Sequence, residues 1–236
     1  IVVDETTIAS DIVKALIRSQ IVHVVPSSKI ENIENYYYDI SKGIGELFCM
    51  EEDLTTGNKV GEFWTDIKYD LSFTNSFRHS NKRQPFHTDG SYESNAPDIS
   101  FFYCLQKAKY GGSTIFVDRH TIIDCLSIYD PELLQILQSK EFLFSKGNDY
   151  KSKRVITEQS FNWNYFRIEK SESSERFHDF LERFIFDGGL YTSINLNLDE
   201  AVFFWDEKML HGRTSFLGQR WLRKGGIRWN RLEKNC

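Results

Sequence analysis

Residues 196–213 read LNLDEAVFFWDEKMLHGR, and this stretch places an apolar run shortly before a histidine and a glycine. The segment 194–205 has the aromatic and β-branched content of a buried strand. His211 follows this strand and precedes Gly212. We therefore expect His211 to lie at a strand end, where its side chain can face a cavity.

Further strands and helices are expected on both sides of this stretch. Strands are predicted at 21–25, 70–77, 99–108, 113–118 and 221–229, and helices at 8–19, 31–48, 121–137 (broken at Pro131) and 174–186. The pattern predicts a mainly β protein with helical additions (α+β), as a single domain over residues 1–236 with an insert at roughly 120–190. A jelly roll or barrel-like sandwich would close such a core, and an open α+β sheet is the alternative.

The composition excludes several classes of protein. The chain has 236 residues and a formal net charge of −5, without the basic excess that nucleic-acid binding favours. No apolar run reaches the roughly 20 residues of a membrane helix. The four cysteines are scattered and form no CxxC pair, and the N-terminal stretch does not have the pattern of a signal peptide. We expect a cytoplasmic protein that binds neither nucleic acid nor a membrane.

The stretch FHTDGSY at 86–92 carries a candidate metal site. In an extended segment residues i and i+2 share a face, so His87 and Asp89 can reach one metal ion while Thr88 points away. With His211 they form two imidazoles and one carboxylate, a set that leaves three positions open and suits Fe(II). Zinc favours a more closed tetrahedral set. The alternative is that Asp89 caps a turn and His87 is an ordinary half-buried residue.

The remaining four histidines are better explained by structural roles. His23 alternates within a strand, His79 lies in a basic loop, His120 begins a helix and His178 occupies a helix beside an aspartate. None of them is expected to bind iron.

Taken together, the motifs HTDGSY, GGST and LNLDEAVFFWDEKMLHGR, followed by a late arginine, resemble the TauD/TfdA (clavaminate synthase-like) dioxygenases over roughly residues 75–230. The resemblance implies a double-stranded β-helix (jelly-roll) core with N-terminal helices and a helical insert. It implies that His87, Asp89 and His211 bind Fe(II) and that Thr114 contacts 2-oxoglutarate. Because Asp89 is present, where related halogenases have a small residue, an oxygenase is expected.

The resemblance also implies an arginine for the distal carboxylate of 2-oxoglutarate, because arginine pairs with a carboxylate through two hydrogen bonds. Arg223 is the first choice, since it shares a strand face with Trp221, and Arg228 and Arg220 are the alternatives. The pair Gly225–Gly226 can introduce a bulge that changes this register. Two departures from the family are the Asp206–Glu207 pair, often Asp-Asn, and the short spacing from His211 to Arg223.

The expected reaction uses Fe(II), O2 and 2-oxoglutarate to hydroxylate an aliphatic C–H bond of a small polar or anionic substrate, with release of succinate and CO2. An amino acid, a small acid and an acidic sugar all fit, and Arg78 and Arg167 are candidate anchors. Residues 146–153 are expected to form a polar loop that could cover the site. Desaturation, epoxidation and cyclisation remain alternatives, as does a metal-binding jelly-roll sensor or binding module without catalysis.

Overall fold

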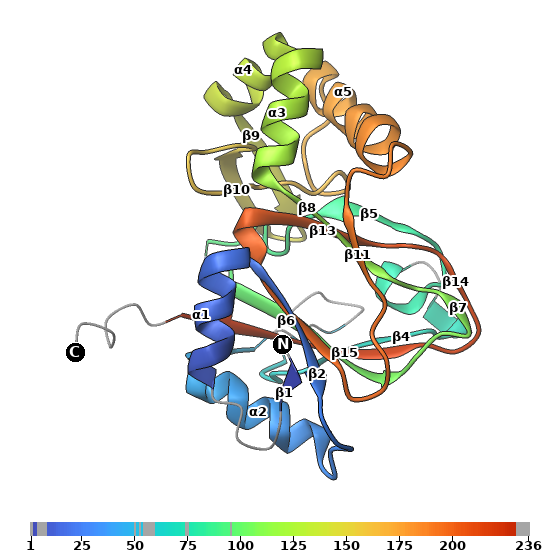
Figure 1. The fold of residues 1–236 in the computed structure, drawn as a ribbon. Coiled ribbons are helices and arrows are strands. Elements are labelled where there is room, and N and C mark those ends of the chain that lie inside the picture. Colours follow the sequence, from blue (N-terminus) through green and yellow to red (C-terminus); the bar gives the residue numbers. More distant parts are fainter. Residues whose placement is uncertain are drawn as a thin grey trace, which may run out of the picture.

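The computed structural model describes residues 2–3, 9–49, 51, 53, 60–73, 76–94 and 96–229. Its core is a pair of β-sheets (Figure 1). The larger sheet has the strand order β1 (Val2–Val3), β2 (Ile21–Pro26), β12 (Ala201–Trp205), β6 (Ile99–Gln106), β15 (Trp221–Arg228) and β3 (Glu46–Phe48), and β4 (Thr65–Lys68) also pairs with β15. The smaller sheet has the order β11 (Thr192–Ile194), β8 (Thr114–Asp118), β13 (Met209–Arg213) and β5 (Gln84–His87).

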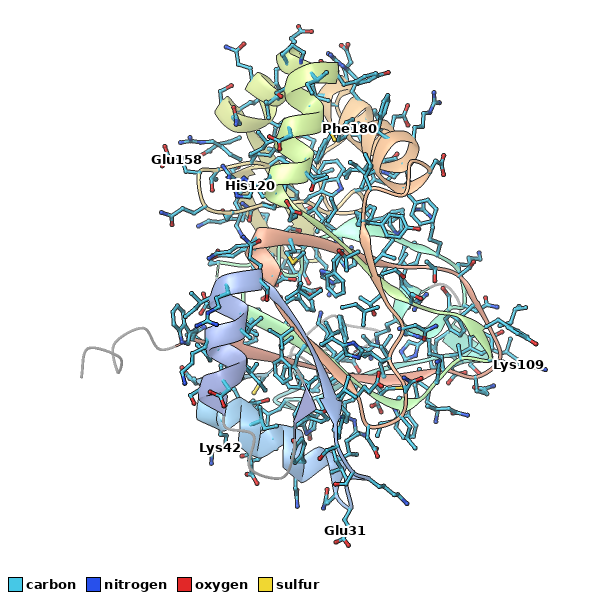
Figure 2. All side chains as sticks on the ribbon, in the orientation of Figure 1. Glu31, Lys42, Lys109, His120, Glu158 and Phe180 are labelled. Carbon is cyan, nitrogen blue, oxygen red and sulfur yellow. The ribbon has the colours of Figure 1, made fainter. Side chains whose placement is uncertain are left out.

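Side chains from the two sheets pack against each other. Phe204 of β12 lies edge-on to Phe116 of β8, with 5.0 Å between the ring centroids. Met209 of β13 and Leu222 of β15 belong to the same buried cluster. Figure 2 shows side chains occupying the space between the sheets. Apart from the parallel pair β1–β2, the strand pairings within the described residues are antiparallel, so the predicted antiparallel core with helical additions is confirmed.

Two helices cover the other face of the larger sheet (Figure 1). The helix α1 (Ala9–Ser19) buries Ile12 and Leu16, and α2 (Ile33–Ile44) buries Tyr37, whose ring stacks on Tyr103 of β6. Helix α2 is shorter than the predicted 31–48, because the chain turns at Gly45 and then pairs with β15 as strand β3.

The segment between β8 and β11 forms a second layer of helices. It contains α3 (Arg119–Tyr129), α4 (Pro131–Ser139), the hairpin β9 (Glu141–Lys146) and β10 (Asp149–Arg154), α5 (Glu172–Phe180) and a π-helical turn (Leu181–Phe186). Phe180 is buried within this layer (Figure 2). The break at Pro131 was predicted correctly: Asp130 ends α3 and caps α4. The single-domain boundaries and the insert at 120–190 stay predictions.

Three predictions about elements are wrong. The predicted strand at 70–77 is replaced, where the chain is described, by two 3-10 turns (Leu71–Phe73 and Phe77–His79). The predicted strand at 194–205 is divided into β11 and β12, because the chain turns at Asp199, which has a φ of +69°. The predicted loop at 146–153 is mostly the β9–β10 hairpin, with its turn at Gly147. A further small pair joins β7 (Tyr110–Gly111) to β14 (Phe216–Leu217).

None of the helices in the described ranges combines the length and the apolar character that crossing a bilayer requires.

Candidate active site

His87, Asp89 and His211 meet at one point of the smaller sheet. His87 ends β5 and pairs directly with His211 in the middle of β13, while Asp89 follows two residues after His87. Each residue offers one ligand atom, and the three atoms lie within 4.8 Å of one another. His87 Nε2 is 3.9 Å from Asp89 Oδ1, and His211 Nε2 is 3.7 Å from Asp89 Oδ2. His211 lies within a strand, not at its end as predicted.

The histidines are held in forms that leave one nitrogen of each ring for a metal. His87 Nδ1 lies 2.9 Å from the carbonyl oxygen of Pro85, and a neutral imidazole that donates there has its lone pair on Nε2. Burial lowers the pKa of His87, and burial together with the neighbouring His87 lowers the pKa of His211 well below its usual value. Both rings are therefore neutral, as metal ligation requires.

Asp206 connects two of the three candidate ligands. Its Oδ2 accepts a 2.9 Å hydrogen bond from the backbone N–H of Asp89, and its Oδ1 lies 3.4 Å from His211 Nδ1. Burial raises the pKa of Asp206 well above its usual value, and the charge of Asp89 raises it further. A carboxyl group beside the second nitrogen of a ligating histidine restricts the orientation of the ring. Asp206 is thus placed to orient both His211 and Asp89.

Lys224 of β15 forms a buried ion pair with Asp89 Oδ2. Although burial would raise the pKa of Asp89, the charge of Lys224 holds this pKa below its usual range, so the carboxylate is ionised. This arrangement concentrates two neutral imidazoles, one carboxylate and one ammonium at the wall of a cavity. The two nitrogens and one oxygen fit Fe(II), because the open side of such a set can accept further ligands.

The cavity beside these residues has a volume of about 620 Å³ and lies between the two sheets. Its apolar wall includes Ile67, Phe102 and Leu222. Its charged wall is mostly basic, with Arg78, Lys146, Arg167, Arg213, Arg220 and Lys224 against Asp89 and Glu93. Such a cavity favours anionic ligands of small size.

Arg220 and Thr114 line this cavity and are almost completely buried. Arg220 Nε donates a 3.1 Å hydrogen bond to the carbonyl oxygen of Gly112, and Arg220 forms no ion pair with any residue that the structure describes. Burial, reinforced by the charge of Arg213, lowers the pKa of Arg220 to about 9. A buried guanidinium without a carboxylate partner is unfavourable unless an anion binds to it.

The two other candidate arginines lie outside the cavity. Arg223 donates hydrogen bonds to Asp66 (2.9 Å) and Glu34 (2.6 Å). Burial would lower the pKa of Arg223, but its interactions with Asp66 and Tyr103 raise this pKa overall. Arg228 Nη1 lies 3.9 Å from Glu46. Neither side chain lines the cavity, whereas Arg220, the third candidate, does. Leu222 and Lys224 of β15, and Arg220 directly before this strand, line the cavity instead.

The two candidate substrate anchors, Arg78 and Arg167, both line the cavity, but only one of them is free of an ion pair within the described residues and can bind an anionic ligand. Arg78 donates two hydrogen bonds to Glu51, of 3.2 and 2.8 Å, and is therefore already paired. The side chain of Arg167 has no such carboxylate among the described residues.

Sequence reasoning missed two polar residues of the cavity wall, Lys224 and Gln84. Gln84 Nε2 lies 3.1 Å from His87 Nε2. The i, i+2, i+4 alternation from Arg220 could have identified Lys224.

The four other histidines are placed in structural roles. His23 bonds to Glu200 at 2.9 Å, and His79 accepts a hydrogen bond from Arg78 while its Nδ1 lies 2.9 Å from the carbonyl oxygen of Lys68. His178 stacks on Tyr165. His120 is exposed at the start of α3. None of the four belongs to the ligand group.

Comparison of the sequence with family models gives a match over residues 38–225 to the family described as taurine catabolism dioxygenase TauD, TfdA family. The match covers most of the chain and includes all three candidate ligands.

Solved structures with similar folds are oxygenases. An asparagine oxygenase in complex with Fe(II), 3-hydroxyasparagine and succinate has a TM-score of 0.73 at 13% identity, and covers 93% of this chain and 78% of its own. The PvcB protein from Pseudomonas aeruginosa has a TM-score of 0.70 at 15% identity, covering 94% and 80%. The oxygenase OrfP, in complex with Fe and α-ketoglutaric acid, has a TM-score of 0.69 at 13% identity, covering 94% and 79%. At these identities the similarity establishes the fold.

Proposed function

This chain belongs to the TauD, TfdA family of dioxygenases, and on that premise we propose that it is an Fe(II)- and 2-oxoglutarate-dependent oxygenase that hydroxylates an aliphatic C–H bond of a small anionic substrate. One observation carries the proposal. The two imidazoles and one carboxylate stand together at the wall of a cavity that is also lined by a buried arginine without an ion pair among the described residues.

In this proposal His87, Asp89 and His211 bind the iron, leaving three positions open. When bound, iron and 2-oxoglutarate supply the oxidising chemistry: one oxygen atom of O2 enters the substrate C–H bond, the other enters succinate, and CO2 leaves. The chain itself supplies orientation. Asp206 holds Asp89 and His211, and Pro85 holds the ring of His87.

Arg220 and Thr114 are proposed to bind 2-oxoglutarate. The unpaired guanidinium of Arg220 can form two parallel hydrogen bonds with the distal carboxylate, which offsets the cost of its burial. Thr114 is paired with Arg213 across β8 and β13 and can add a hydroxyl hydrogen bond. Arg213 donates to the carbonyl oxygens of Ser80 and Lys82, so its fixed charge strengthens the positive potential at this end of the cavity.

Lys224 is proposed to bind an anionic group of the substrate. Once iron takes the charge of Asp89, the ammonium of Lys224 needs another partner in its buried position. A substrate carboxylate there would fix the carbon skeleton beside the metal, with Phe102 and Leu222 in contact with its apolar part. The neighbouring structures hold hydroxylated asparagine or arginine, which are also small polar molecules.

Two finer points belong to the same proposal. The facing sheets support a jelly-roll core, since β8 and β13 of the smaller sheet pack against β6, β12 and β15 of the larger one. The free thiols of Cys49, Cys104 and Cys125 support a reducing, cytoplasmic environment.

The test is a turnover assay with Fe(II), O2 and 2-oxoglutarate, in which succinate is measured with and without a panel of small acids and amino acids. We expect slow succinate formation alone and faster formation with a suitable acid, whose product gains one oxygen atom. Asp89→Ala should abolish both. If iron-loaded protein forms no succinate under any of these conditions, the oxygenase proposal fails.

A further inference from the structure

Arg167 lies at the cavity wall with its charge uncompensated. The side chain lines the cavity and is half-buried. It has no hydrogen bond, ion pair or aromatic contact with any part of the chain that the structure describes, whereas Arg78 on the same wall is fully paired with Glu51. A half-buried guanidinium with no partner is a recognition group for an anion from outside the protein.

The backbone of Arg167 is fixed in place. Its carbonyl oxygen accepts a 2.8 Å hydrogen bond from Ser145 of β9, and its N–H donates to the carbonyl oxygen of Asn164 at 3.0 Å. The next residue, Ile168, forms a β-bridge with Phe144 and is buried. The guanidinium is therefore presented from a rigid segment, which reduces the entropy lost when an anion binds.

The carboxylate that could balance this wall is already engaged. Glu93 lines the cavity, and its negative charge acts on Lys153, where it opposes the lowering of the Lys153 pKa by burial. Asp89 belongs to the candidate metal site. On the described cavity wall we therefore find basic groups for anions but no uncommitted carboxylate for the ammonium of an amino acid.

We propose that the substrate is a dicarboxylate, with one carboxylate on Lys224 beside the metal and the second on Arg167. The inference rests on the proposed function, and it narrows the substrate from a small anion to a dianion. It also separates this chain from the neighbours whose structures hold zwitterionic amino acids. Arginine suits the distal carboxylate, because its planar fork can donate two hydrogen bonds to it.

The experiment compares matched ligands of the iron-loaded protein. Straight-chain α,ω-dicarboxylates of increasing length, their monoamides, and the corresponding α-amino dicarboxylates are added under anaerobic conditions to protein with Fe(II) and 2-oxoglutarate. Perturbation of the iron-to-2-oxoglutarate absorption band gives Kd, and succinate formation in air gives kcat/KM. The variants are Arg167→Gln, Arg167→Lys and the control Arg154→Gln, an exposed arginine outside the cavity.

We expect one dicarboxylate to bind about tenfold or more tightly than its monoamide and its amino derivative, which is the size of a charge-assisted hydrogen bond. Arg167→Gln should remove that preference, Arg167→Lys should keep part of it, and Arg154→Gln should leave it unchanged. The inference is overturned if monoamides or amino derivatives bind as well as dicarboxylates, or if Arg167→Gln keeps the preference. If the absorption band itself never forms, the failure lies with the proposed function.

Discussion

Two arginines three residues apart, Arg220 directly before β15 and Arg223 within it, are in opposite situations. Arg223 points outward, where it bonds to Asp66 and Glu34. Arg220 points inward, is buried, and has a carbonyl oxygen of Gly112 as its partner among the described residues. The outward arginine connects β15 to β4 and α2 through its two carboxylate partners, whereas the burial of the inward one destabilises the folded protein unless an anion binds to it. An arginine therefore indicates an anion-binding site only where its charge is not already paired with a carboxylate of the protein.

The largest effect expected from this contrast is on cosubstrate binding. Arg220→Gln should raise the Kd for 2-oxoglutarate about 100-fold, because it removes a charge-assisted pair in a buried site. Arg223→Gln should change it less than about twofold, because Arg223 lies outside the cavity. Anaerobic titration with 2-oxoglutarate measures both. Equal losses in the two variants would show that the contrast is wrong.

The same contrast applies to two aspartates. Asp206 is buried behind His211 and Asp89, whereas Asp66 is partly exposed and pairs with Arg223. Asp206→Asn should weaken Fe(II) binding about tenfold or more, the usual effect of removing a group that orients ligands. Asp66→Asn should leave the affinity unchanged. The check is competition for Fe(II) against a chelator, and retention of full affinity in Asp206→Asn would remove the proposed orienting role.

A smaller effect is expected when the same comparison is made between two lysines, one inside and one outside the cavity. Lys224 bonds to Asp89, a candidate ligand, and Lys68 lies over the ring of Trp221 outside the cavity. Lys224→Met should strengthen Fe(II) binding a few-fold, because a cation no longer competes for Asp89. It should also abolish the acceleration of succinate formation by an acidic substrate. Lys68→Met should do neither. Weaker Fe(II) binding in Lys224→Met would contradict this account.

The smallest effects are expected on stability. Arg223→Gln should lower the free energy of unfolding of the metal-free protein by up to about 1 kcal/mol, because its two carboxylate partners are about half exposed to solvent. Arg220→Met should leave that free energy unchanged or raise it, since a buried and unpaired charge is removed. Urea denaturation measures both. A larger loss in Arg220→Met than in Arg223→Gln would mean that Arg220 stabilises the empty protein.

The candidate ligands could be predicted from the sequence because local geometry determines them. The two-residue spacing of His87 and Asp89 keeps both on one side of an extended chain, and an apolar strand near His211 indicated a position in the core. Pairing of His211 with His87 across β13 and β5 depends on the sheet order, which no local pattern encodes. That His211 joins His87 and Asp89 in one site was therefore predicted only from the order of the motifs, through the family resemblance.

The face of β15 could not be chosen from hydrophobicity. Trp221 suggested an inward face, yet its Nε1 donates to Asp66 and its ring contacts Lys68 outside the cavity. A register shift occurs between Trp221 and Leu222, not at the expected glycine pair. Gly225 instead allows the ring of Phe101 to pack closely against the backbone, because a Cβ at this position would lie 2.5 Å from that ring.

The β9–β10 hairpin was missed for a related reason. Phe142 and Phe144 alternate on β9, but every side chain of β10 is polar or partly exposed, so the second strand has no apolar period. Its pairing is determined by backbone hydrogen bonds and by the turn at Gly147, which has a φ of +59°. Strands of this kind carry little signal in sequence periodicity.

The most direct test of the central claim is anaerobic absorption spectroscopy of the purified protein during addition of Fe(II) and 2-oxoglutarate. The account predicts a visible charge-transfer band that requires both additions, disappears in His87→Ala, persists in Arg223→Gln, and needs far more 2-oxoglutarate in Arg220→Gln. A band that survives in His87→Ala, or none in protein that has bound Fe(II) and 2-oxoglutarate, would contradict the proposed iron site.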